Sequence, residues 1–166
     1  SAVQEVSLSP SSVAARQNML NAAESTVAQF TSVGTQLSSI EKNSYSDLTG
    51  QVSALNQLAD QLASINVSLN RVNSIDKQPN ELLDQRDTLI QDMSKPLRVH
   101  AVEKNNGAVD IHIGDVASGQ YLVQGNKGST LGIERSPTNP DKAVLMLDPH
   151  MSPQAVSQVV GGSIAG

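Results

Sequence analysis

The sequence contains no cysteine and no tryptophan, and its 166 residues include one phenylalanine and two tyrosines. Without cysteine the chain can form neither a disulfide nor a cysteine-ligated zinc site, and it has no thiol nucleophile. With three aromatic rings in all, it is a poor candidate for an aromatic-lined ligand pocket or for a surface on which nucleic-acid bases stack.

Basic residues are also scarce, because 11 Lys and Arg stand against 16 Asp and Glu, for a net charge of −5. Such a chain lacks the electrostatic footprint of a nucleic-acid-binding protein, so we expect no nucleic-acid partner. No apolar run approaches the roughly 20 residues that span a bilayer, and no signal peptide is recognisable, so we expect no membrane partner. The hydrophobic fraction of 38% still indicates a chain that folds.

Charge and hydrophobic periodicity both change near residue 95. Residues 1–94 carry ten acidic and five basic side chains, whereas residues 95–166 carry six of each. The apolar period falls from that of a helix to that of a strand at the same place. We therefore predict an α+β fold with a helical domain over residues 1–95, a small antiparallel β domain over 96–150, and a return segment over 151–166 towards the helical domain.

Three helices are predicted in the helical domain, at about residues 11–40, 46–75 and 81–94. The apolar residues of the first two follow the 3-4 alternation of helices that pack lengthwise on one another. We expect the polar linker between them to turn the chain, so that they form a long antiparallel hairpin with the third helix beside it. In the first helix, the seam consists of Val13, Leu20, Ala23, Val27, Phe30 and Leu37.

A helical hairpin buries a stripe of side chains and not a full core, so the apolar seams are expected to need further helices as partners. Arg86 is expected to hold the third helix to the hairpin. The residues that we expect to carry the packing are Leu55, Leu62 and Leu69 on the second helix and Leu82, Arg86 and Leu89 on the third.

The strand part begins with a predicted β-hairpin around Asn105-Asn106-Gly107. Its two apolar sets share one face only if Lys104 pairs with Ala108, which leaves a three-residue loop with Gly107 at the position that needs a left-handed backbone. Three further short strands are expected over 120–123, 131–134 and 143–147, for a sheet of about five strands.

The predicted register also places His100 opposite His112, on the face away from the core. Cross-strand neighbours lie about 5 Å apart, close enough to share a metal ion. The simpler interpretation is two exposed surface histidines, because two ligands are too few for a structural metal site. His150 is interpreted as a loop residue.

No arrangement of residues indicates catalysis. Asp84 and Asp87 lie one turn apart with Arg86 between them, which is typical of an ion pair on a helix rather than of acid–base chemistry. The sequence lacks the G-x-S-x-G elbow and the phosphate-binding loop. Asn66-Val67-Ser68 matches a glycosylation sequon, but it falls within the second predicted helix and is interpreted as chance. We predict no catalytic residue and no cofactor.

Residues 80–90 read Asn-Glu-Leu-Leu-Asp-Gln-Arg-Asp-Thr-Leu-Ile. This segment resembles the signature of the hook-associated protein 1 family, which forms the hook-filament junction of bacterial flagella. Residues 10–17, the Asn106-Gly107 hairpin, and residues 122–125 and 161–166 resemble other family segments in the same order. Met93 stands where many family members carry leucine, which is a volume-conserving exchange.

The resemblance implies a structural component of the flagellum that joins hook and filament and supports filament assembly. It implies an extracellular location, reached through the flagellar secretion channel without a cleaved signal peptide. The implied partners are further copies in a ring, the hook protein, the second junction protein on the filament side, and an export chaperone. Because the polymerising terminal segments of the family are missing, the chain is interpreted as an internal fragment.

Two other functions stay open on the residues alone. One is a helical ligand-sensing or adhesion ectodomain with a β insert, which would need a pocket and a neighbouring membrane segment. The other is a metal-dependent enzyme around His100 and His112, which would take up zinc stoichiometrically.

Overall fold

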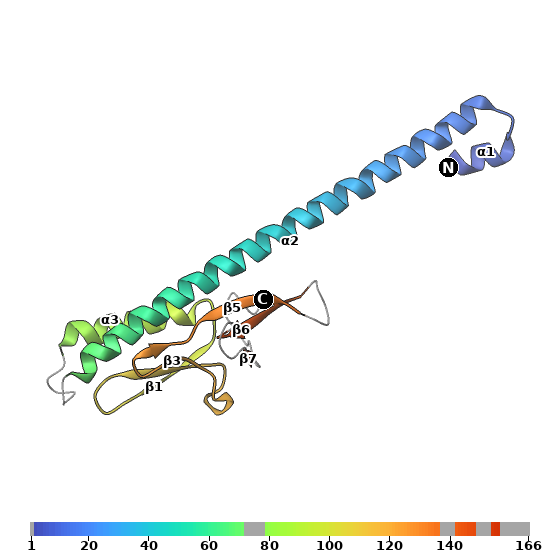
Figure 1. Cartoon of the computed structure of the whole chain (residues 1–166). Helices are drawn as coiled ribbons and strands as arrows, with labels where there is room; N and C mark the ends of the chain where they lie inside the picture. The colour runs from blue at the N-terminus through green and yellow to red at the C-terminus, as the bar shows by residue number, and fades with distance from the viewer. Residues whose placement is uncertain (1, 72–78, 137–141, 149–153, 157–166) are drawn as a thin grey trace. The chain divides into compact units, whose positions relative to one another are not determined.

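The computed structural model describes residues 2–71, 79–136, 142–148 and 154–156, and it confirms the α+β class. By its internal contacts the chain divides into two compact units, Ser1–Ser44 and Tyr45–Gly166. The helices are α1 (Ala2–Leu8), α2 (Val13–Asn70), α3 (Asn80–Ser94) and the 3-10 turn η2 (Val116–Ser118) (Figure 1). The strands are β1 (Val99–Glu103), β2 (Val109–Ile113), β3 (Tyr121–Gln124), β4 (Lys127–Gly128), β5 (Leu131–Arg135), β6 (Ala143–Leu147) and β7 (Gln154–Ala155).

The predicted hairpin of two long helices is wrong, because α2 is one continuous helix of 58 residues. Residues 41–45 contain no proline or glycine, and exposed Glu, Lys, Asn and Ser cost a helix little. The seven-residue repeat of the first seam also continues in the same register through Leu48 to Leu55. The polar stretch was therefore an exposed part of a helix and not a turn.

The third predicted helix is present as α3, which lies beside the C-terminal part of α2 (Figure 1). The residue before it, Pro79, has an extended backbone with φ −63° and ψ 122°, as expected of a proline that begins a helix. The end of the second predicted helix near residue 75 and the break at 76–78 lie outside the described residues.

The β part forms two antiparallel sheets rather than one of about five strands. The first has the strand order β1-β2-β3-β4 and the second has the order β5-β6-β7. The predicted hairpin register is confirmed, since the Lys104 amide donates to the Ala108 carbonyl at 2.8 Å and His100 pairs with His112. Gly107 has φ +79°, the left-handed conformation that glycine adopts without strain.

One core joins α2, α3 and both sheets within the unit of residues 45–166. Its members include Leu55 and Leu62 of α2, Met93 of α3, Ile111 of the first sheet and Leu145 of the second. The predicted boundary at residue 95 therefore does not separate two cores. The sheets cover the apolar face of α2 that we had assigned to another helix. The predicted return segment over 151–166 lies almost entirely outside the described residues.

Candidate functional site

The buried face of α2 carries an asparagine where its seam would be expected to carry an apolar residue. Asn66 is fully buried between Leu62 and Leu69. Its Nδ2 donates to the carbonyls of Val109 at 2.7 Å and Gly125 at 2.6 Å, and its Oδ1 accepts from the Val109 amide at 2.9 Å. The side chain thus pairs with the backbone where the ladder between β2 and β3 ends.

A second asparagine makes the same kind of contact with the other sheet. Asn56 donates through Nδ2 to the Leu131 carbonyl at 2.9 Å and accepts from the Leu131 amide at 2.8 Å. An amide side chain matches a backbone donor and acceptor at once, so the two asparagines fix α2 to both sheets. Because Asn66 is buried, a glycan cannot be attached to it in the folded protein. This agrees with the interpretation that the sequon occurs by chance.

Arg86 holds α3 to the β1–β2 hairpin. The side chain is 10% exposed, and its Nη1 donates to the Gly107 carbonyl at 2.7 Å and to Glu103 Oε1 at 2.8 Å. Its Nε donates to Asp87 Oδ1 at 2.8 Å. Burial by itself would lower the pKa of the guanidinium, but the hydrogen bonds and charges of Asp87 and Glu103 outweigh it and raise that pKa. The predicted contact with a helical hairpin is thus a contact with a β-hairpin.

The remaining predicted packing residues divide into buried and half-buried positions. Leu55, Leu62 and Leu69 are fully buried. Leu82 and Leu89 on α3 are half-buried, and Leu89 packs against the core with one side. Leu55 and Leu62 belong to the core that α2 shares with both sheets, and not to a seam between two long helices as predicted.

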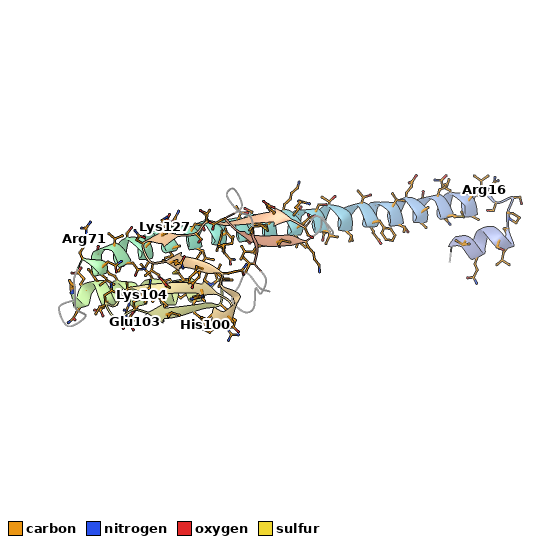
Figure 2. All side chains as sticks on the ribbon, turned by 60° about the horizontal axis from the view of Figure 1, so that its bottom comes forward. Arg16, Arg71, His100, Glu103, Lys104 and Lys127 are labelled. Atoms are coloured by element: carbon orange, nitrogen blue, oxygen red, sulfur yellow. The ribbon has the colours of Figure 1, made fainter. Side chains whose placement is uncertain are left out.

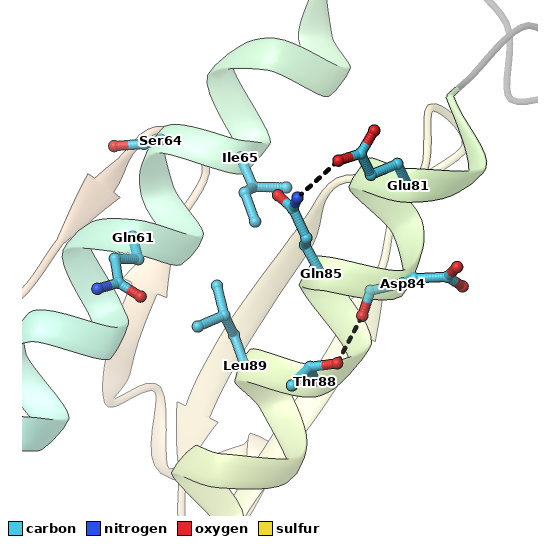
Figure 3. Close-up of a pocket in the computed structure, with 8 residues that line it drawn as sticks. All are labelled: Gln61, Ser64, Ile65, Glu81, Asp84, Gln85, Thr88 and Leu89. Atoms are coloured by element: carbon cyan, nitrogen blue, oxygen red, sulfur yellow. Dashed lines mark hydrogen bonds between the residues drawn. The ribbon is translucent and has the colours of Figure 1, made fainter.

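A groove runs between α2 and α3 (Figure 3) and has a volume of about 740 Å³. Ile65 and Leu89 point towards each other across it, and Gln61 and Ser64 lie on its α2 side. Its α3 side consists of residues from the family-like segment, namely Glu81, Asp84, Gln85, Thr88 and Leu89. That segment therefore has one face on the β1–β2 hairpin, through Arg86, and another on an open groove.

In the unit of residues 1–44, the apolar seam of α2 is exposed. The exposed fraction is 55% for Leu20, 75% for Phe30 and 67% for Leu37. Seven-residue spacing keeps these side chains on one face. An apolar stripe of this length is typical of a surface that packs against other protein. We call it the exposed seam, and it consists of Val13, Leu20, Ala23, Val27, Phe30 and Leu37.

The two α3 carboxylates considered for acid–base chemistry, those of Asp84 and Asp87, belong to residues that make different contacts. Asp84 accepts a hydrogen bond from Thr88 through its backbone carbonyl, and Asp87 is bound to Arg86. In the part of the chain that the structure describes, no three His, Asp or Glu side chains are grouped to hold a metal ion. Over the same residues, no helical stretch combines the length and the hydrophobicity of a membrane-spanning segment. His150 lies outside them.

The two histidines occupy different environments, contrary to the interpretation of both as exposed. His112 is buried, with 4% of its surface exposed, whereas His100 is half-buried. The His112 ring lies 4.2 Å from the Tyr121 ring, centroid to centroid. The pairing of β2 with β3 shifts register beside His112, which brings Tyr121 over it. The alternation in the sequence could not show this, because it predicts a strand over 120–123 without showing that Tyr121 pairs with His112.

The fold and these contacts define a class of protein: an α+β module in which one long helix braces two small sheets and presents an apolar seam, without a catalytic constellation among the described residues. A family model described as the flagellar hook-associated protein FlgK helical domain matches residues 1–166. The chain belongs to this family.

Relatives with known names support the assignment. The chain is 29% identical over 134 residues to flagellar hook-associated protein 1 of Salmonella typhimurium, which covers 80% of this chain and 24% of that protein. The protein of the same name from Escherichia coli gives the same identity and coverage. The solved flagellar hook junction protein FlgK of Burkholderia pseudomallei is 28% identical with a TM-score of 0.85, over 99% of this chain and 30% of that one. The chain thus spans about a quarter of the length of these curated relatives.

Proposed function

We propose that the chain is a structural module of the flagellar hook-filament junction, acting outside the cell and not as an enzyme. The observation that carries this proposal is the family match over the whole chain, together with named relatives from hook-associated proteins. The helical sensing or adhesion ectodomain is disfavoured, because the same relatives are flagellar. A metal-dependent enzyme is disfavoured because the relatives are named for their place in the flagellum.

The exposed seam gives this role a physical basis. An assembly subunit needs a surface that gains free energy when neighbouring protein covers it. Phe30 and Leu37 lie three-quarters and two-thirds exposed, so covering them removes apolar area from water. The unit of residues 45–166 contributes a second element, a compact unit whose helices and sheets are joined through Asn56, Asn66 and Arg86.

The partners in this proposal are further copies of the protein in a ring, the hook protein, the second junction protein on the filament side, and an export chaperone. The route outward is the flagellar secretion channel, without a cleaved signal peptide. The family membership and the names of the relatives support these finer statements.

Substitution in the exposed seam tests the proposal in a full-length hook-associated protein 1 that carries this segment. Leu37→Asp places a charge on the seam, and Ser39→Asp places the same charge two residues away on an exposed position. We expect Leu37→Asp to reduce swimming and the number of filaments per cell, with Ser39→Asp close to wild type. Circular dichroism of both variants checks that the helix is retained. Normal swimming and filament number with Leu37→Asp would show that the seam is not an assembly surface.

A further inference from the structure

We propose that His100 and His112 form a two-histidine binding site for a divalent transition-metal ion on the first sheet. The site lies on the β1–β2 hairpin, where Figure 2 shows His100 with Glu103 and Lys104 on the same strand and turn. It is separate from the exposed seam and does not depend on the proposed function.

The register places the two histidine backbones at a separation that permits chelation. His100 and His112 are direct cross-strand partners. The Lys104 amide donates to the Ala108 carbonyl, and the Gly114 amide donates to the Arg98 carbonyl. Hydrogen-bonded pairs alternate with non-hydrogen-bonded pairs along an antiparallel ladder. The pair of His100 and His112, which lies between these two, is therefore also a hydrogen-bonded pair. Its Cα atoms are then about 5.5 Å apart with both side chains on one face. Two imidazoles so placed can each bring a nitrogen about 2.0–2.1 Å from one ion.

His112 has an unpartnered ring nitrogen and an aromatic neighbour. Its Nδ1 is a buried side-chain polar atom for which the described residues provide no hydrogen-bond partner. A neutral imidazole has one acceptor nitrogen, so an unpartnered Nδ1 is available to accept a hydrogen bond or to bind an ion. The Tyr121 ring, at 4.2 Å and an interplanar angle of 43°, limits the rotation of the imidazole. Less side-chain entropy is therefore lost when His112 binds a metal.

The neighbouring carboxylate is not free to complete the site. Asp110 Oδ1 lies 2.8 Å from Lys104 Nζ and accepts from the Gly125 amide at 2.6 Å. The protein therefore supplies two imidazole ligands, and water supplies the others. Imidazole suits Zn²⁺, Ni²⁺ and Cu²⁺, and Cu²⁺ forms the strongest complexes in that series. We expect binding of Cu²⁺ to be tighter than binding of Zn²⁺.

Titration of the 166-residue chain with CuCl₂ and with ZnCl₂, followed by calorimetry, tests the site. We expect one Cu²⁺ per chain, with two imidazole nitrogens in its electron paramagnetic resonance spectrum. His100→Gln and His112→Gln should each weaken binding at least tenfold. The matched control is His150→Gln, which removes the third histidine of the chain and should leave the affinity unchanged.

Two results would overturn the proposal. The first is unchanged Cu²⁺ affinity in His100→Gln, a half-buried edge-strand position where the variant is expected to fold even if His112→Gln does not. The second is loss of binding in His150→Gln, which would move the ion to another part of the chain.

Discussion

Replacing Asn66 by leucine would complete the apolar seam of α2 and should nevertheless destabilise the protein. The substitution removes the side chain that satisfies the amide and carbonyl of Val109 and the carbonyl of Gly125. Because Asn66 and its two bonds to Val109 are buried, water cannot replace those two bonds. The bond to the Gly125 carbonyl is partly buried. The leucine side chain presents no donor or acceptor to the end of the β2–β3 ladder.

The magnitude follows from the three backbone groups left without a partner. A buried, unsatisfied group costs about 1–3 kcal/mol, so the two Val109 groups at about 2 kcal/mol each and the partly buried Gly125 carbonyl at about 1 kcal/mol cost about 5 kcal/mol. Burial of a leucine side chain in place of the amide returns about 2 kcal/mol. The expected loss in the free energy of unfolding is therefore about 3 kcal/mol, a large part of the stability of an ordinary domain.

Urea unfolding followed by tyrosine fluorescence measures this effect, since Tyr45 and Tyr121 both belong to the unit of residues 45–166. Hydrogen exchange at the Val109 amide should accelerate in the same variant. Gln57→Leu, on an exposed position of the same helix, is the control and should change stability by less than about 0.5 kcal/mol. An Asn66→Leu protein as stable as wild type, or more stable, would refute the reasoning.

Arg86→Ala should destabilise the unit of residues 45–166 by about 2–3 kcal/mol, because the buried bond to the Gly107 carbonyl is lost. The bonds to Asp87 and Glu103 add less, since both carboxylates are more than half exposed; an unchanged melting temperature would contradict this assignment. Gly34→Ala should stabilise α2 by about 0.5–1 kcal/mol, since nothing lies within 4 Å of the added Cβ. Greater helicity by circular dichroism checks it, and lower helicity would mean that the glycine has another role.

Several features of the fold could be predicted because they depend on residues close in sequence. The hairpin register at Lys104 and Ala108 follows from alternation and from the glycine of a three-residue loop, and both are local. Helix α3 follows from a proline start and an apolar repeat within one segment. The continuity of α2 could also have been predicted, because positions 41 and 48 keep the seven-residue spacing that connects Val13 with Leu55. A polar stretch was mistaken for a turn.

The candidate site was less predictable, because its residues gain their roles from partners distant in sequence. Nothing beside Asn66 in the chain indicates that it faces Val109, which is 43 positions away. The same holds for Asn56 and Leu131, 75 positions apart. A polar residue within an apolar seam was the only available signal, and it is compatible with an exposed position as well.

By itself the sequence determined the secondary structure of α3 and of the first hairpin, the absence of thiol chemistry, and the family. These properties rest on local periodicity, on composition and on a contiguous motif. The tertiary structure alone decided that sheets and not a second helix cover α2, that Arg86 reaches a β-turn, and that His112 is buried against Tyr121. Burial depends on which surfaces meet, and a hydrophobic pattern specifies that a face is covered without specifying what covers it.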